Sequence, residues 1–288
     1  MRIFTILLAF VSLFLFSCKK ENHSGNGTSN GEDTSALGKF ISATGITDAT
    51  VKVDLDSLIA RARRHGWWNS CNVIYPFAGG TSTTCKYNLK DPRDSDAAFR
   101  LVFNGSTWTF DSYGIHPGAS GYGYTYFNPS IQIADPNSCH LSVYSLDDVA
   151  GGSDNGDIGA WGDGLGFYLS ARDAWPDSSG KPFASIANDG FQGTSVNGAG
   201  FFLATKASGA SADFYRDSLL MTSVSSSPGN LPNLNLFICN QNFPYGAEPY
   251  SAGFSQRGLA FITIGSGING TMEAFMYSDI DSFVNSKR

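Results

Sequence analysis

The sequence is poor in the side chains that carry out most enzyme chemistry. It holds four glutamates and four histidines in 288 residues. Glu21 and Glu32 stand in a polar N-terminal stretch, Glu273 opens a helical pattern, and Glu248 stands alone in a loop. A retaining glycosidase needs two carboxyl groups about 5–5.5 Å apart, and no predicted strand places two carboxylates on one face. The sequence therefore favours a protein without catalytic activity. A glycoside hydrolase built on converging aspartates stays as the less favoured alternative.

Signatures of nucleophilic catalysis, zinc binding and nucleic-acid binding are also missing. The chain has no Gly-x-Ser-x-Gly nucleophile motif and no Cys-x-x-Cys pair. His116 and His140 have no evident nucleophile beside them, so we interpret both as structural. Lys and Arg together number 19 against 25 acidic residues, for a net charge of −6. This balance argues against a nucleic-acid partner, which requires a basic face. We interpret the basic run Arg61–His65 as compensation for a helix dipole.

Long apolar runs are absent except near the N-terminus. Ile3 to Phe16 is an apolar run of about 14 residues, too short to cross a bilayer, which needs about 20 residues. It fits the apolar region of a signal peptide. The segment Leu15–Cys18 resembles a bacterial lipobox, which implies a signal peptide over residues 1–17 and lipidation of Cys18. We expect export, a tether over residues 18–39, and a membrane anchor in the cell envelope, at the outer membrane. A secretory signal with a chance cysteine is the alternative.

Glycine and aromatic residues are abundant, and both favour sheets joined by tight turns. The chain has 33 glycines and 14% aromatic residues. Helical spacing of apolar residues appears twice, over Thr47–His65 in an N-terminal helical segment (residues 40–66) and over Thr271–Val284. Residues 67–288 instead alternate in short runs, which predicts an all-β sandwich of two antiparallel sheets. The predicted strands are Asn72–Phe77, Phe99–Phe103, Thr107–Phe110, Ser130–Ile133, His140–Leu146, Gly166–Ala171, Phe183–Ala187, Gly200–Thr205, Ala212–Arg216, Leu234–Asn240 and Gly258–Gly265.

Several segments resemble a group of bacterial and phage domains with the concanavalin A-like, LamG-type jelly-roll fold. The resemblance implies a jelly-roll sandwich that lectins use to bind carbohydrate, although fold alone does not determine function. Adhesion to another protein is the second reading. The segments that carry the resemblance are Val73–Phe77, Tyr87–Asp94, Ala97–Leu101, His140–Ser145, Asp157–Ala160 and Phe261–Ile268.

Aromatic residues next to polar ones supply the candidate carbohydrate contacts. Trp161 precedes Asp163 in a glycine-rich segment predicted to be a loop, where the ring can stack on a sugar and the carboxylate can bind its hydroxyl groups. Trp175 is a second such ring. Tyr124 belongs to an alternating run, Tyr122 to Tyr126, that predicts a row of aromatic rings on one face. Glu248 completes the candidate set. Packing at the edges of the sandwich is the alternative role for these rings.

Cysteines and aspartates suggest two further features. In an exported protein Cys71 and Cys85 flank a turn-like segment, so we predict a disulfide between them. Cys139 and Cys239 are either a second pair or free thiols. Asp154 and Asp157 are candidate Ca²⁺ ligands, although their spacing does not match an EF-hand and aspartate beside glycine is common in turns. We expect no other cofactor.

Overall fold

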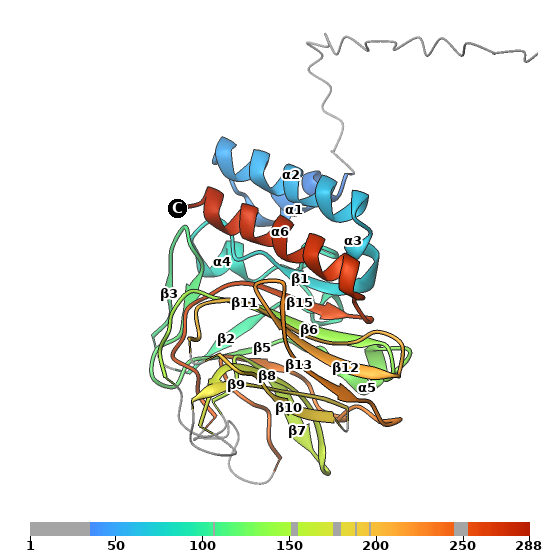
Figure 1. Ribbon diagram of the computed structural model, residues 1–288. Helices are drawn as coiled ribbons and strands as arrows, with labels where there is room; N and C mark the ends of the chain where they lie inside the picture. Colours follow the sequence, from blue (N-terminus) through green and yellow to red (C-terminus); the bar gives the residue numbers. More distant parts are fainter. Residues whose placement is uncertain are drawn as a thin grey trace, which may run out of the picture. The chain divides into compact units, whose positions relative to one another are not determined.

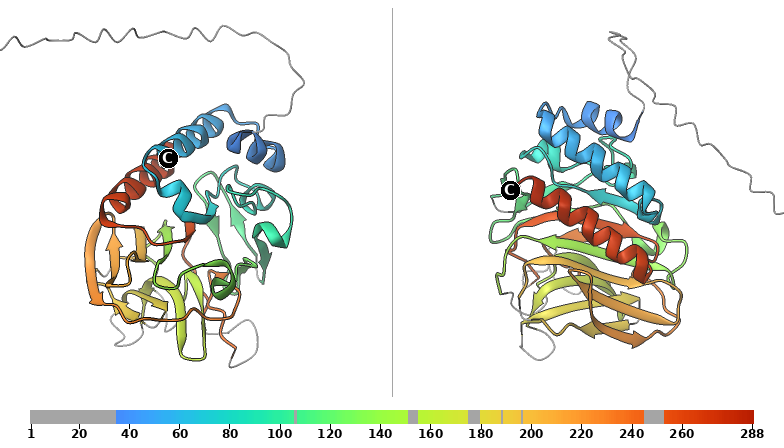
Figure 2. Two further views of the ribbon diagram at one scale, coloured as in Figure 1. Left: turned by 90° about the vertical axis from the view of Figure 1, so that its right-hand side faces the viewer. Right: turned by 45° about the horizontal axis from the view of Figure 1, so that its top comes forward.

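The computed structural model describes residues 35–105, 107–150, 155–174, 180–187, 189–195, 197–244 and 253–288. All of them belong to one compact unit. Two β-sheets lie face to face, and helices cover the far side of one sheet (Figures 1 and 2). Every pairing between the named strands is antiparallel. The predicted sandwich of two antiparallel sheets is confirmed.

The first sheet has eight described strands in the order β13-β12-β11-β6-β15-β4-β3, with β1 also paired to β15. Its middle strands are buried on both faces, because side chains pointing one way meet the second sheet and those pointing the other way meet the helices. Val143 and Phe202 enter the core between the sheets, whereas Tyr144 and Phe201 enter the core under the helices. The strands are β1 (Cys71–Tyr75), β3 (Thr109–Phe110), β4 (Ile115–His116), β6 (Cys139–Ser145), β11 (Gly200–Lys206), β12 (Ser211–Arg216), β13 (Leu219–Ser225) and β15 (Leu259–Gly265).

The second sheet has seven described strands in the order β10-β9-β8-β7-β14-β5-β2. One of its faces closes the core between the sheets with Ile158, Phe167, Leu169, Ile186 and Ile238. The other face points away from the first sheet and is called the outer face below. The strands are β2 (Val102–Asn104), β5 (Tyr122–Tyr124), β7 (Ile158–Gly162), β8 (Leu165–Asp173), β9 (Lys181–Ala187), β10 (Asp189–Gln192) and β14 (Phe237–Ile238).

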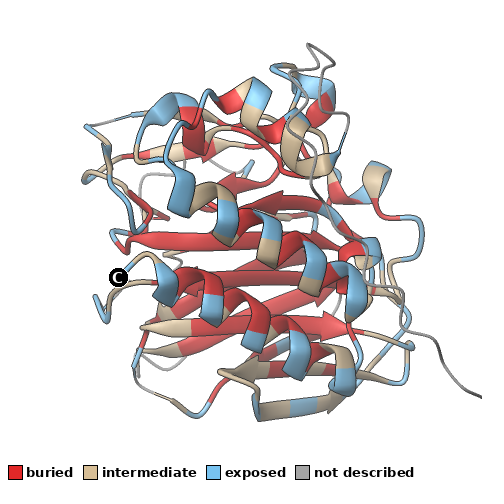
Figure 3. Ribbon diagram, turned by 90° about the horizontal axis from the view of Figure 1, so that it is seen from above, coloured by how far each residue is buried: buried red, intermediate tan, exposed pale blue. Residues whose placement is uncertain are grey.

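Helices α2 and α6 lie across the first sheet, and their buried sides face its strands (Figure 3). Asp48 caps α2 through the amides of Thr50 and Val51, at the predicted start. Asp279 links α6 to the end of α2. Its Oδ2 accepts a hydrogen bond from Trp67 Nε1 at 2.9 Å and lies 2.7 Å from Nδ1 of His65, the C-cap residue of α2. The helices are α1 (Ala36–Thr44), α2 (Ala49–Arg64), α3 (Trp67–Ser70), α4 (Ser82–Cys85), α5 (Pro129–Gln132) and α6 (Gly270–Ser286). Within the described ranges, none of them has the length and apolar character needed to cross a membrane.

Three local predictions were wrong. Residues 36–39, assigned to the tether, form the first turn of α1, which Ser35 caps and which buries Phe40 completely. Residues 130–132 of the predicted strand 130–133 lie in α5, where Asn128 caps the helix and Pro129 occupies its first position. Phe99 sits at φ 59° and is excluded from β2.

The predicted disulfide is also wrong, because Cys71 and Cys85 are both free and buried. Cys71 begins β1 and belongs to the core under the helices, whereas Cys85 ends α4 and belongs to the core between the sheets. The two thiols therefore belong to different core clusters. Burial raises the pKa of Cys71 to about 12 and that of Cys85 to about 11. Cys139 and Cys239 are free as well.

Candidate functional site

Aromatic side chains are concentrated on the outer face of the second sheet. Tyr168, Phe183 and Phe237 are buried, with 2%, 5% and 2% of their surface exposed, yet they lie outside both core clusters. Cross-strand pairing places Tyr124 beside Phe237, Phe237 beside Gly159, and Gly159 beside Tyr168. Because successive residues of a strand point to opposite faces, this row of neighbours shares the outer face.

The tyrosine row predicted from the sequence is present at one end of this face. Tyr122, Tyr124 and Tyr126 are all partly exposed, while the residues between them are buried. The ring of Tyr124 lies 5.1 Å from that of Phe237 and 4.6 Å from that of Tyr126. Gly123 points inward, where a β-carbon would lie 2.4 Å from Ile238. The alternation of large and small residues therefore holds the tyrosines on the outer side.

Asparagine side chains provide polar groups next to the tyrosines. Asn235 Nδ2 donates a hydrogen bond to Tyr124 Oη at 2.6 Å, which leaves the tyrosine hydroxyl proton to be donated elsewhere. Asn242 Nδ2 donates to the carbonyl oxygen of Asn235 at 2.7 Å, and Asn242 Oδ1 is a buried acceptor without a partner. Neither asparagine was among the predicted site residues. Their positions depend on pairing between strands far apart in the sequence.

Trp161 lies on a strand, which corrects the prediction that it sits in a loop. It belongs to β7, two residues from Gly159, and so shares the outer face with Tyr124. Its ring lies over Gly166, where a β-carbon would come within 2.6 Å of the indole. Strand spacing of about 4.8 Å and a rise of about 3.4 Å per residue place Trp161 about 12 Å from Tyr124 along the face. Both rings are partly exposed.

Asp163 forms part of the hairpin turn between β7 and β8. Asp163 and Gly164 have φ values of 54° and 76°, and they connect the paired residues Gly162 and Leu165. A two-residue turn with both φ values positive is the type I′ hairpin, for which Asp-Gly is a preferred sequence. The turn thus accounts for the aspartate at this position. It also places an exposed carboxylate at the end of the strand that carries Trp161.

Asp157, proposed from the sequence as a calcium ligand, forms a buried ion pair. Its Oδ1 accepts hydrogen bonds from Ser255 Oγ at 2.6 Å and Arg257 Nε at 2.9 Å, and its Oδ2 accepts one from the Ala171 amide at 2.7 Å. Asp157 and Arg257 are both completely buried. The charge partner of Asp157 is therefore Arg257 and not a metal ion. Nowhere in the described part of the chain do three His, Cys, Asp or Glu side chains come close enough to hold a metal.

Four predicted site residues, Cys18, Asp154, Trp175 and Glu248, lie outside the described residues. Of the predicted carbohydrate contacts, the structure thus brings Trp161 and Tyr124 onto one face and places Asp163 at its edge.

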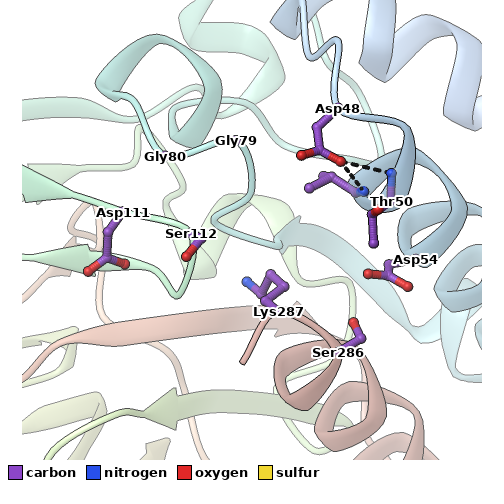
Figure 4. Close-up of a pocket in the computed structure, with 10 residues that line it drawn as sticks. Asp48, Thr50, Asp54, Gly79, Gly80, Asp111, Ser112, Ser286 and Lys287 are labelled. Carbon is purple, nitrogen blue, oxygen red and sulfur yellow. Dashed lines mark hydrogen bonds between the residues drawn. The ribbon is translucent and has the colours of Figure 1, made fainter.

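A cavity lies beside the C-terminus of α6 (Figure 4). The cavity is about 520 Å³ and is lined by Asp48, Thr50, Val51, Asp54, Gly79, Gly80, Asp111, Ser112, Ser286 and Lys287. Figure 4 shows Lys287 between Asp54 and Asp111, and burial lowers the pKa of this lysine to about 8. The carboxylates therefore face an ammonium group and not each other. No aromatic ring is among the described residues that line this cavity. Its carboxylates do not form the acid pair that a glycosidase needs.

Comparison with known proteins supports the fold and nothing finer. No family model matches the chain, and no curated protein sequence matches it. Domain 4 of AbnA, a GH43 extracellular arabinanase from Geobacillus stearothermophilus solved with arabinotriose, matches 72% of this chain and 98% of its own length at 10% identity, with a TM-score of 0.52. The two share a β-sandwich fold.

Two weaker structural matches complete the comparison. A mutant sialidase of Trypanosoma rangeli matches 78% of this chain at 11% identity, with a TM-score of 0.47. A GH54 α-L-arabinofuranosidase matches 60% at 11% identity, with a TM-score of 0.41. This chain spans 39% of the sialidase and 41% of the arabinofuranosidase.

Proposed function

We propose that this protein is a lipid-anchored protein of the cell envelope that binds carbohydrate without catalysis on the outer face of its second sheet. The observation that carries the proposal is the set of partly exposed rings on that face, Tyr122, Tyr124, Tyr126 and Trp161. Ring faces offer apolar area to the C–H surfaces of a sugar, and tyrosine, asparagine and aspartate groups hydrogen-bond its hydroxyls. The face combines both kinds of group.

The likeness to an arabinanase domain solved with arabinotriose guides the choice of ligands. At 10% identity this is an analogy between folds. It makes arabinotriose and arabinan the first ligands to test. The LamG-type resemblance of the sequence supports the same class of ligand.

Replacing Tyr124 or Trp161 by alanine should weaken glycan binding by about 30-fold, because truncating an aromatic anchor costs about 2 kcal/mol. Binding of the soluble chain from Lys19 onward is measured on a glycan array and by calorimetry with the best polysaccharide. Tyr124→Phe keeps the ring and should retain most of the affinity. Phe275→Ala is the matched control, because this ring is 43% exposed on α6, on the opposite side of the sandwich.

Two results would argue against the aromatic face. One is the absence of binding to any glycan on the array. The other is an equal loss of affinity in Phe275→Ala and Tyr124→Ala, which would mean that the rings do not act through this surface.

The anchor is tested separately at Cys18. Cys18→Ala should abolish incorporation of labelled palmitate and release the protein from the membrane fraction, because Cys18, directly after the expected signal peptide, would provide the acylated sulfur. Cells are labelled, fractionated and blotted, with Cys71→Ala as the control variant. A Cys18→Ala protein that still carries label and sediments with membranes would contradict the lipoprotein assignment.

Protein binding is the second candidate function, favoured by an exposed apolar edge. Leu219 and Leu220 begin β13, the outermost strand of the first sheet, and are 72% and 54% exposed. Exposed apolar edge strands are sites where another chain can pair. If this function dominates, partner binding is lost in a Leu219→Asp variant and soluble glycans do not compete.

A further inference from the structure

A second, positively charged cavity lies at the start of the described chain, away from the aromatic face. It has a volume of about 360 Å³ and is lined by Ala36, Lys39, Arg63, Trp68, Leu89, Lys90 and Pro92. These residues come from α1, α2, α3 and the segment after β1, which lie together in Figure 1. Three cationic side chains and no carboxylate line this cavity, although the chain as a whole carries a net charge of −6.

The three cations are not neutralised by the acidic groups around them. Among the described residues, no ion pair involves Lys39, Arg63 or Lys90. Asp91 is close enough to Lys39 for their charges to interact, but Arg93 engages it, with Nε 2.7 Å from Oδ1. The neighbouring basic residues Arg61 and His65 point instead to Asp279. The cavity therefore keeps an uncompensated positive charge.

Trp68 holds two of the cations in place. The Arg63 guanidinium carbon lies 5.1 Å from the centroid of the Trp68 ring, and Lys90 Nζ lies 4.4 Å from it. Lys90 Nζ also donates a hydrogen bond to the carbonyl oxygen of Trp68 at 2.7 Å. Burial, opposed by Cys71 and assisted by Arg63, lowers the pKa of Lys90. Two positive groups that repel each other are thus fixed against one buried ring, an arrangement that an anion would stabilise.

We propose that Lys39, Arg63 and Lys90 form a binding site for a phosphate group of a larger ligand. A phosphate carries close to two negative charges as a monoester and one as a diester, and in both forms its several acceptor oxygens match three cationic donors better than a single carboxylate does. The first turn of α1, a nine-residue helix that begins at Ala36, adds the positive end of its dipole at the same cavity. The space exceeds that of a bare phosphate, and Leu89, Pro92 and Trp68 form apolar walls for the attached organic part.

The phosphate can belong to a soluble metabolite or glycan, or to a lipid headgroup. About 16 residues separate Cys18 from Ser35, so a fully extended connection reaches at most about 60 Å. If Cys18 is acylated as proposed above, the cavity works within that distance of a membrane. The phosphate site itself does not depend on the aromatic face or on glycan binding.

The test titrates the soluble chain from Lys19 onward with inorganic phosphate and follows amide shifts by NMR. The same protein is then mixed with vesicles of phosphatidylglycerol or of phosphatidylcholine. Arg63→Gln and Lys90→Gln should each weaken phosphate binding by about tenfold, since a hydrogen bond to a charged group contributes about 1.5 kcal/mol. Arg64→Gln is the matched control. It removes the same positive charge from the neighbouring residue, but Arg64 is not part of the cavity lining.

The outcomes separate the two phosphate sources. Saturable phosphate binding that is lost in Arg63→Gln and kept in Arg64→Gln supports the site with a soluble ligand. Binding to phosphatidylglycerol vesicles alone, with the same pattern among the variants, supports it with a lipid headgroup. Absence of binding to both probes overturns the proposal, and so does an equal loss in Arg63→Gln and Arg64→Gln, which would indicate a general effect of net charge.

Discussion

Replacing Arg257 by leucine should lower the free energy of unfolding by about 3–5 kcal/mol, because the change leaves the Asp157 carboxylate buried without a charge partner. Both residues are fully buried in the structure. Leucine is also shorter than arginine, so the cavity that it leaves contributes to the loss. The addition of Asp157→Asn described below separates the effect of the stranded charge from that of the cavity.

Arg257 is embedded in a complete set of acceptors. Besides Asp157, its guanidinium donates to the carbonyl oxygens of Val149 and Arg172 at 3.1 Å and of Asn155 at 2.9 Å. It also donates to Ser170 Oγ at 3.0 Å. Asp157 precedes β7 and Ser170 lies on β8, whereas Arg257 precedes β15. The pair thus links the sheet that carries the aromatic face to the sheet that carries the helices.

The comparison variant is Arg93→Leu, which breaks the exposed pair with Asp91 and should change the stability little, because solvent screens this pair. Urea unfolding followed by tryptophan fluorescence measures both variants. Adding Asp157→Asn to Arg257→Leu should restore part of the loss, because the buried charge is then gone while several carbonyl groups stay unpaired. If Arg257→Leu were no more costly than Arg93→Leu, the buried pair would not be holding the two sheets together.

Local patterns predicted most of the fold, because most of its elements have strong local signals. Strand β6 alternates apolar and polar residues along most of its length, β11 contains an apolar run, and α2 and α6 have apolar stripes at helical spacing. Errors arose where the signal was short or ambiguous. The strand β13 (Leu219–Ser225) was missed because four of its seven residues lie exposed at the sheet edge. The first turn of α1 was missed because only Phe40 is fully buried in this helix.

The candidate site was predictable only in part. The alternation Tyr122-Gly-Tyr-Thr-Tyr126 predicted the tyrosine row, because alternation determines which side of a strand a residue occupies. Trp161 was assigned to the wrong element, since the type I′ hairpin at Asp163 was interpreted as an open loop. Neither the asparagines beside the tyrosines nor the basic cavity could be predicted from the sequence. Trp68, Lys90 and Arg63, for example, come together only through tertiary packing.

Glu273→Gln should have the opposite sign to Arg257→Leu and should stabilise the protein by about 2 kcal/mol at pH 8. Glu273 lies in the first turn of α6, where the helix dipole favours a negative charge by about 0.3–1 kcal/mol. Its side chain is nevertheless only 2% exposed, and Oε1 has no hydrogen-bond partner. Desolvation outweighs the dipole, and burial raises the pKa of Glu273 from 4.5 to about 7.

The sign of the pH dependence follows from this pKa. A carboxyl group whose pKa is higher in the folded state disfavours folding once it ionises, so it costs nothing below about pH 4.5 and its full penalty above about pH 7. Each pKa unit corresponds to about 1.4 kcal/mol, which gives about 3 kcal/mol. A glutamine keeps a buried amide that also lacks a partner, so about 2 kcal/mol of this should be recovered.

Relative to the wild type, Glu273→Gln is therefore expected to be about 1 kcal/mol less stable near pH 4.5 and about 2 kcal/mol more stable from pH 7 upward, with the difference changing steadily in between. Asp56→Asn, which removes an exposed carboxylate from α2, serves as the control and should leave the pH profile unchanged. Parallel profiles for the wild type and Glu273→Gln between pH 4.5 and 7 would mean that water or a rearranged neighbour solvates the carboxylate. A divergence confined to that range would identify Glu273 as the group that makes the packing of α6 on the first sheet weaker at neutral pH than in mild acid.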